Sequence, residues 1–202
     1  MKERGMIFNA EMVRAILDGR KTQTRRTVKP QPDEDGLAKV INGPWVDTSE
    51  RNYRCPFGDV GDRIWVRETW AEVGASAPNL KLYRANYPEH VPSHYENVPP
   101  ANEIRWTPSI HMPRWASRIL LEITNVRVER LNSIHDVDAM REGIQNLTTC
   151  SHADFGIPGV VNAQHPVRAF QLLWESIYGA DNWKANPWVW FIEFKVFNCG
   201  GD

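Results

Sequence analysis

The spacing of apolar residues along the chain predicts three helices. The first runs from Asn9 to about Gly19, where Asn9 can cap the N-terminus and Gly19 can end the last turn. A short helix is expected over about Asp136 to Glu142, and a longer one from Pro166 to Tyr178. The first and third helices each carry an apolar stripe at helical spacing, formed by Met12, Val13, Ile16, Leu17 and by Phe170, Leu173, Trp174, Ile177.

Three segments have the composition or the alternation of β-strands. They are Arg63 to Glu68, Arg118 to Arg130 with a bend at Asn125, and Trp188 to Phe197. Proline and glycine interrupt residues 29–61 and 71–113, which we expect to be loops. The pattern therefore predicts an α+β fold built on a small mixed or antiparallel sheet, or on a barrel.

Length and composition place the chain among ordinary soluble proteins. It has 202 residues, with 24 Lys and Arg against 25 Asp and Glu, and 42% of its residues are hydrophobic. These values exclude a polycationic nucleic-acid coat and a disordered acidic tail. The apolar stretches are too short to span a membrane, so we expect no membrane partner. The three cysteines (Cys55, Cys150, Cys199) are odd in number and widely spaced, so no disulfide framework is expected. This favours a reducing cytoplasm.

The segment Gly19–Arg26 is the main candidate for chemistry. It places Lys21 among three arginines and three residues before Thr24. Neighbouring cations or burial can lower the pKa of a lysine, which could then act as a base for a threonine nucleophile. The alternative is a solvated basic stretch that interacts with the helix C-terminus. Because the segment is polar, we expect Lys21 to be replaceable without loss of stability.

Other residues offer weaker signals. Glu142 lies at a helix end, where it is either an exposed carboxylate or an acid with a raised pKa. Tryptophans beside arginines, such as Trp70 near Arg67, can stack on RNA bases or anchor loops. No metal site is expected, because the histidines and the Cys150–His152 cluster lack ligand spacing. Phosphate-loop and dinucleotide motifs are absent as well, so no cofactor is expected.

The motif over Gly19–Arg26 resembles that of the ASCH domain family. Gly19, Lys21 and Arg26 match the motif, and Thr24 stands where many members carry glutamate. The Thr variant resembles the branch of bacterial N(4)-acetylcytidine amidohydrolases. Four further segments follow the family order, and other features are similar to ASCH proteins of phages and prophages. The four segments are Gly58–Trp70, Ile119–Leu131, Ala139–Ile144 and Trp188–Val196.

The resemblance implies one PUA-like domain over residues 1–202, a small β-barrel with flanking helices and insertions at about 29–57 and 71–108. It also implies that Lys21 is the base, Thr24 the nucleophile and Glu142 the proton donor. These three side chains should then converge in one concave pocket walled by Arg26 and Trp70. Arg20, Arg25 and Arg26 would contact substrate or RNA, although Arg25 replaces an apolar residue of the motif.

Three functions follow from these observations. The first is an amidohydrolase acting on an acylated nucleoside or modified base. The second is a module that binds or processes single-stranded RNA, a ribonuclease included. The third is a non-catalytic accessory protein of a phage or prophage in the bacterial host cytosol. The sequence does not indicate an oligomeric state.

Overall fold

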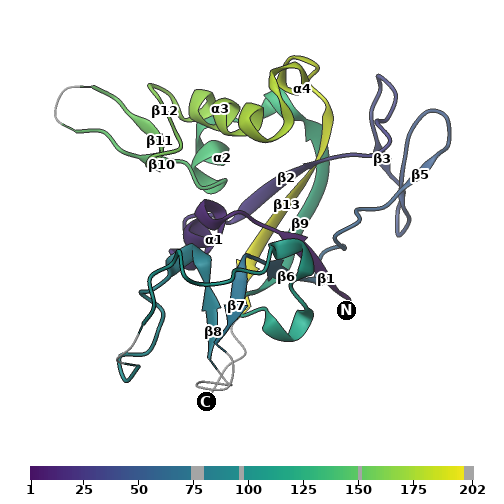
Figure 1. Ribbon diagram of the computed structural model, residues 1–202. Helices are drawn as coiled ribbons and strands as arrows, with labels where there is room; N and C mark the ends of the chain where they lie inside the picture. The colour runs from purple at the N-terminus through teal and green to yellow at the C-terminus, as the bar shows by residue number, and fades with distance from the viewer. Residues whose placement is uncertain (74–79, 96–97, 150–151, 198–202) are drawn as a thin grey trace.

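A five-stranded sheet forms the centre of the protein (Figure 1). The computed structural model describes residues 1–73, 80–95, 98–149 and 152–197. The strand order is β1-β6-β9-β13-β2, in which β1 and β6 are parallel and the other pairs are antiparallel. The strands are β1 (Glu3–Ile7), β2 (Gln23–Thr27), β6 (Arg63–Arg67), β9 (Leu120–Arg130) and β13 (Trp188–Val196).

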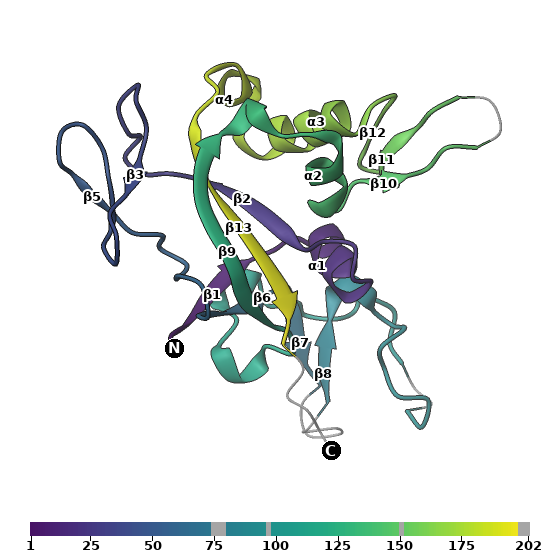
Figure 2. The same ribbon diagram turned by 180° about the vertical axis from the view of Figure 1, so that it is seen from behind.

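Within the described residues, four α-helices accompany this sheet: α1 (Ala10–Leu17), α2 (Asp136–Arg141), α3 (Pro166–Tyr178) and α4 (Ala180–Lys184). Helix α1 begins where the Asn9 side chain accepts a hydrogen bond of 2.8 Å from the Met12 backbone N–H. Figures 1 and 2 show α2, α3 and α4 gathered at one end of the sheet, with α1 beside β2. Single 3₁₀ turns occur at Arg84–Asn86, Ser109–His111, Arg114–Ala116 and Leu131–Ser133.

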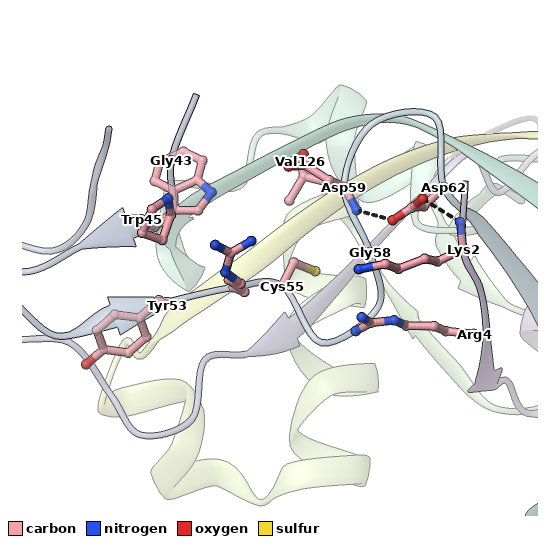
Figure 3. A pocket seen from close by; sticks show the side chains of 12 residues that line it. Lys2, Arg4, Gly43, Trp45, Tyr53, Cys55, Gly58, Asp59, Asp62 and Val126 are labelled. Atoms are coloured by element: carbon pink, nitrogen blue, oxygen red, sulfur yellow. Dashed lines mark hydrogen bonds between the residues drawn. The ribbon is translucent and has the colours of Figure 1, made fainter. Parts of the chain in front are cut away.

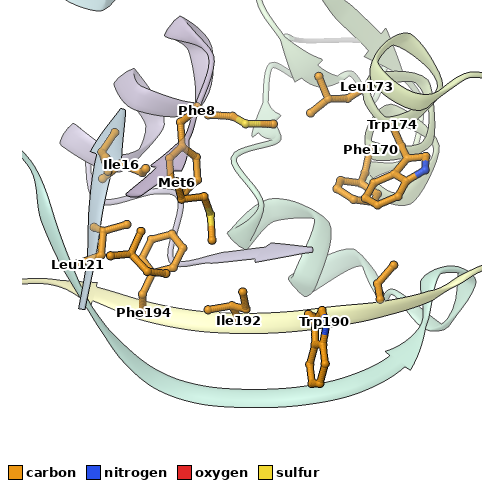
Figure 4. Close-up of a cluster of buried hydrophobic side chains, with 14 of the residues drawn as sticks. Met6, Phe8, Ile16, Leu121, Phe170, Leu173, Trp174, Trp190, Ile192 and Phe194 are labelled. Atoms are coloured by element: carbon orange, nitrogen blue, oxygen red, sulfur yellow. The ribbon is translucent and has the colours of Figure 1, made fainter. Parts of the chain in front are cut away.

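The hydrophobic core lies between the sheet and the helices (Figure 4). Val13 and Ile16 of α1 are almost fully buried, as are Leu121 of β9 and Ile192 of β13. The apolar stripe of α3 extends the same cluster at the other end through Phe170, Leu173 and Trp174. Burial of these side chains is the main force that holds the helices against the sheet.

Short strands form three peripheral sheets. One consists of β3 (Ala38–Lys39), β4 (Trp45–Val46) and β5 (Asn52–Tyr53), and another of β7 (Trp70–Glu72) and β8 (Lys81–Tyr83). The third consists of β10 (Gln145–Asn146), β11 (Phe155–Ile157) and β12 (Val161–Ala163). Figures 1 and 2 show them extending from the body in different directions. Parts of both expected loop insertions are therefore regular, although 74–79 and 96–97 lie outside the described residues.

The sequence predictions of helices and long strands are confirmed within one or two residues. The bend expected at Asn125 is a register irregularity at the neighbouring residue, since Glu193 pairs with Asn125 and Phe194 with Ile123. The expected closed barrel is wrong. Over the described residues the sheet is open, and β1 and β2 are its two unpaired edges. The fold is α+β and rich in strands. Within the described ranges, no helix is long and apolar enough to cross a bilayer.

Candidate functional site

A tight turn after α1 delivers Lys21 to the sheet. The backbone N–H groups of Arg20 and Lys21 both donate to the Ala15 carbonyl at 2.9 Å, which closes the helix end. Gly19 makes this possible because its φ of +71° lies in the left-handed region that favours glycine. The next N–H, from Thr22, donates to the Arg141 carbonyl at 2.9 Å and so fixes the start of β2 against α2.

Lys21 and Glu142 form a buried ion pair. The ammonium Nζ lies 2.7 Å from Glu142 Oε2 and 2.8 Å from the Glu142 backbone carbonyl oxygen. The whole residues are only 2% and 4% exposed, respectively. Glu142 caps the C-terminus of α2, where carbonyl groups give the helix end a partial negative charge. The lysine therefore neutralises both the carboxylate and the helix end.

Arg25 binds the second carboxylate oxygen of Glu142. Its Nη1 donates to Glu142 Oε1 at 3.0 Å, and the same guanidinium contacts Glu129 at 2.7 Å and Asp138 at 3.2 Å. The side chain is fully buried, and its guanidinium carbon lies 5.0 Å from the centre of the Phe191 ring. Arg25 is thus an internal connector between three carboxylates, and its expected contact with substrate or RNA stays a prediction.

The cluster is close to electrically neutral. Lys21 and Arg25 face three carboxylates, and Arg127 adds a third cation through a 2.9 Å hydrogen bond from its Nε to Glu129. Lys21, Arg25 and Glu142 are buried, and the other three side chains are partly exposed. Buried charges are tolerated only when each is paired and hydrogen-bonded. We name these six residues the buried charge cluster: Lys21, Arg25, Arg127, Glu129, Asp138 and Glu142.

The environment lowers the pKa of Lys21. Burial is the largest cause, because removal from water disfavours the charged ammonium. The carboxylate of Glu142 acts in the opposite direction, while the positive charges of Arg26 and Arg25 lower the pKa further. A lysine with a lowered pKa is a better candidate base than a solvated one.

Thr24 is buried on β2, at 1% exposure, and pairs across the sheet with Ile192 of β13. Alternation along a strand directs Gln23 and Arg25 to one face and Thr24 and Arg26 to the other. The Gln23 amide confirms the first direction, since it donates to the Asp138 carbonyl at 3.0 Å. Thr24 therefore lies on the strand that carries Arg25, with its side chain on the opposite face.

Arg20 and Arg26 border open spaces. Arg26 Nη2 donates to the Ile7 carbonyl at 3.0 Å and lines a groove of about 460 Å³ together with Met12, Arg67 and Tyr178. Arg20 donates to the Gly143 carbonyl at 3.2 Å and lines a second cavity of about 220 Å³. Both arginines can meet a ligand in these spaces.

Trp70 does not wall the buried charge cluster. It lies on β7 and belongs to a separate cluster with Tyr83 and Met112, packed edge-to-face against Trp115 at 5.3 Å between ring centres. Its indole N–H is buried and has no hydrogen-bond partner among the described residues. The expectation that Trp70 contacts the substrate of Lys21 is corrected by this position.

Two sequence alternatives are also wrong in part. The segment over Gly19–Arg26 is not a solvated basic stretch, because Lys21 and Arg25 are buried. Since Lys21 is buried in an ion pair, we expect its replacement to lower stability. Glu142 is not an exposed carboxylate. Lys21 and Glu142 do converge, but in a closed cluster and not in an open pocket, and the Thr24 hydroxyl makes no hydrogen bond to either of them.

Sequence reasoning missed Asp138, Glu129 and Phe191. Asp138 lies four residues before Glu142 on α2, a spacing that places two carboxylates on one helix face. That spacing was a usable signal for a cation between them. Glu129 and Phe191 come from paired strands whose partners are fixed only by the fold, so the sequence offered no comparable signal.

Among the described residues, no group of three or more His, Cys, Asp or Glu side chains is placed to hold a metal ion. Cys150 of the cysteine–histidine cluster lies outside them. Comparison with protein-family models, curated proteins and solved structures finds no match. The function of the chain must therefore be inferred from the chemistry of its own residues.

Proposed function

We propose that the chain is an amidohydrolase that acts on an acylated nucleoside or modified base. The observation that carries this proposal is the 2.7 Å contact between Lys21 Nζ and Glu142 Oε2 in a buried site. A buried lysine beside a carboxylate, with a threonine three residues away, supplies the three types of group that amide hydrolysis requires.

Transfer of a single proton within the Lys21–Glu142 pair can supply both a base and an acid. In the ion pair the proton resides on Lys21 Nζ, and its transfer along the 2.7 Å hydrogen bond yields a neutral amine and a carboxylic acid. Burial favours the neutral amine of Lys21, because removal from water disfavours the charged ammonium. Arg25 contacts Glu142 Oε1 at 3.0 Å, so substrate binding has to alter this contact before Glu142 can act as the acid.

The proposed reaction then proceeds by acyl transfer. The amine of Lys21 accepts the Thr24 hydroxyl proton as the threonine oxygen attacks the amide carbonyl carbon. Glu142 donates its proton to the nitrogen as the carbon–nitrogen bond breaks, which releases the amine. Water then attacks the carbonyl carbon of the threonine ester and loses a proton to the Glu142 carboxylate. The bond between this carbon and the Thr24 oxygen breaks, the Thr24 oxygen takes a proton from the Lys21 ammonium, and the carboxylic acid is released.

Access is the main requirement of this proposal. Thr24 is 1% exposed and its side chain lies on the face of β2 opposite Arg25, so the proposal requires a rearrangement that opens the site and brings the Thr24 hydroxyl to Lys21. Arg26 shares the Thr24 face of β2 and lines the 460 Å³ groove, which has the volume of a small-molecule site. We place the substrate in this groove, with Arg26 at its inner wall.

The resemblance to ASCH domains also supports the proposal, because it implies a PUA-like fold together with these catalytic roles. We propose that the open sheet is a variant of a PUA-like barrel, because Arg26 of one edge strand hydrogen-bonds the Ile7 carbonyl of the other. The same resemblance favours a phage or prophage protein that works in the bacterial cytoplasm.

Single-stranded RNA binding is a second candidate, favoured by Trp115. This side chain is 59% exposed, and the Lys81 ammonium lies 5.2 Å from the centre of its ring. An exposed indole beside a cation is a platform on which a base can stack. In this function Trp115, and not Lys21, would be the residue whose removal weakens activity.

Hydrolysis assays with a panel of acylated nucleosides test the proposal. Thr24→Val removes the hydroxyl while keeping the shape and should abolish hydrolysis, whereas Thr24→Ser should retain it. Thr27→Val, on the same strand, is the matched control and should leave hydrolysis unchanged. Hydrolysis that survives Thr24→Val, or a wild-type protein that is inactive on the whole panel, contradicts the proposal.

A further inference from the structure

A small polar pocket lies where the start of β1 meets the β4–β5 hairpin (Figure 3). Its volume is about 90 Å³, far below the roughly 300–1,000 Å³ of a typical small-molecule site. A space of this size holds one compact group. It shares no residue with the buried charge cluster; its lining includes Lys2, Arg4, Trp45, Arg54, Cys55 and Asp62.

Three cations from distant parts of the sequence line this pocket. Lys2 and Arg4 come from the start of the chain, and in Figure 3 both side chains extend toward Cys55. Arg54 follows β5, about fifty residues later. Arg4 is anchored by its Nη1, which donates to the Pro56 carbonyl. Among the described residues, the Lys2 ammonium and the Arg54 guanidinium have no hydrogen-bond or ion-pair partner.

The acidic groups of the pocket are already engaged. Asp62 accepts hydrogen bonds from the backbone N–H groups of Lys2 at 2.7 Å and Asp59 at 3.2 Å. Asp59 accepts from the Val60 N–H at 2.9 Å and lies 3.7 Å from the Lys39 ammonium. Burial raises the pKa of the Cys55 thiol to about 11, so the thiol is neutral at pH 7. The pocket lining thus carries more positive than negative charge. Among the described residues, its Lys2 and Arg54 side chains have hydrogen-bond donors that no acceptor engages.

Trp45 adds an aromatic wall. Its ring packs edge-to-face against buried Trp190 at 6.2 Å between ring centres, which fixes its orientation. The Lys39 ammonium lies 5.5 Å from the centre of the same ring. An indole held rigidly beside cations is the combination that proteins use to bind a base next to its phosphate.

We infer that this pocket binds the phosphate group of a nucleotide, with the base outside the pocket against Trp45. Arginine donates paired hydrogen bonds to phosphate oxygens, and Lys2 and Arg54 have donors to offer. The phosphate comes from a free nucleotide or from the 5′ end of an RNA strand, which present the same group. The inference stands apart from the hydrolysis proposed for Lys21, because the two sites use different residues.

Binding measurements on the full chain test the site. Cytidine 5′-monophosphate is titrated against the wild type, Arg54→Gln, Lys2→Gln and the control Arg168→Gln, which removes an exposed charge on α3. We expect each pocket variant to weaken binding about tenfold, as for loss of one charged hydrogen bond, and the control to bind like the wild type. Inorganic phosphate should compete, and cytidine without phosphate should bind at least about tenfold more weakly.

Three results would overturn the inference: equal binding of cytidine and its monophosphate, unchanged affinity in Arg54→Gln, or no nucleotide binding by the wild type at millimolar concentration. A 5′-phosphorylated RNA trinucleotide separates the two sources. Tighter binding of the trinucleotide than of the monophosphate identifies an RNA end as the ligand, and equal binding identifies the free nucleotide. Both variants change exposed side chains, so circular dichroism should show an unchanged fold.

Discussion

Glu142 joins Lys21 to Arg25, with one carboxylate oxygen 2.7 Å from the lysine Nζ and the other 3.0 Å from the arginine Nη1. All three side chains are at most 4% exposed. The same carboxylate therefore connects the turn after α1, the edge strand β2 and the end of α2. Because it balances two buried cations at once, its removal affects both stability and any chemistry of the site.

Glu142→Gln should strongly destabilise the fold. Removing one partner of a buried ion pair typically costs about 3–5 kcal/mol, because the remaining charges stay buried without compensation. Urea unfolding at pH 7 measures the loss. Glu122→Gln is the matched control, since Glu122 pairs with the exposed Lys195 at 3.1 Å and should cost less than about 1 kcal/mol. If the free energy of unfolding falls equally in the two variants, burial of Glu142 does not add to the stability that its ion pairs provide.

The lowered pKa of Lys21 predicts a specific pH dependence of stability. Between the lowered folded pKa and the ordinary value of 10.5, the unfolded chain binds more protons than the folded chain. The free energy of unfolding must then increase with pH across this window. Relative to Lys21→Met, which lacks the group, the wild type should gain stability as pH rises from 7 to 10.5. Urea unfolding of both proteins over this range provides the test, and a relative loss would contradict it.

Cys55 predicts the opposite pH dependence. Its thiol pKa is raised from 9.0 to about 11 by burial, so the unfolded thiol ionises first. This contribution is fully present below pH 9 and is lost as pH rises toward 11, by about 3 kcal/mol at about 1.4 kcal/mol per pKa unit. The unfolding free energy of Cys55→Ala should therefore fall less steeply over pH 8.5–10.5. Parallel profiles for the two proteins would show that the thiol does not titrate differently on folding.

The elements that the sequence predicted well are those whose pattern is local. Helix α1 has its cap at Asn9 and its apolar stripe within the next eight residues. Helix α3 likewise has its start signal, Pro166, directly before its own apolar stripe. Strand β2 could not be predicted, because Gln23–Thr27 is polar and has no alternation. Its place in the sheet depends on carboxylates that lie more than 100 residues away.

The candidate site was predictable only in its residue types. The family resemblance implies a base at Lys21 and an acid at Glu142, and the structure places these two side chains in contact. That Arg25 is buried while Arg26 borders an open space follows from the alternation of side chains along β2, and Arg20 lies in the turn before this strand. Three arginines in one short segment look equivalent in sequence, and only the partners supplied by α2 and β9 separate their roles.

Gly143 is expected to be essential for the packing behind Lys21. Its φ is +112°, and an added Cβ would lie 3.2 Å from the Ala15 Cβ and 3.8 Å from the Lys21 Cβ. Gly143→Ala should cost about 1–3 kcal/mol from the backbone conformation alone, and more from the contact. Gly61→Ala is the control, because Gly61 also has a positive φ but no atom within 4 Å of an added Cβ. Thermal unfolding should show a larger loss for Gly143→Ala than for Gly61→Ala.

Lys21→Arg separates a base from a mere positive charge. Arginine keeps the charge beside Glu142 but cannot be deprotonated in a protein. If Lys21 accepts the Thr24 proton, Lys21→Arg and Lys21→Met should each lose about 100-fold or more in hydrolysis, the usual contribution of a positioned base.

Stability must be controlled in this comparison, because Lys21 is 2% exposed and both replacements disturb its pairing with Glu142. Assays are therefore run at a temperature where circular dichroism shows each variant folded. Arg127→Gln serves as a further control, since it removes one cation from the buried charge cluster through a side chain that is 39% exposed and does not contact Glu142. It should keep most of the hydrolysis. If Lys21→Arg is as active as the wild type, Lys21 acts through its charge, and the proton must be accepted by another group.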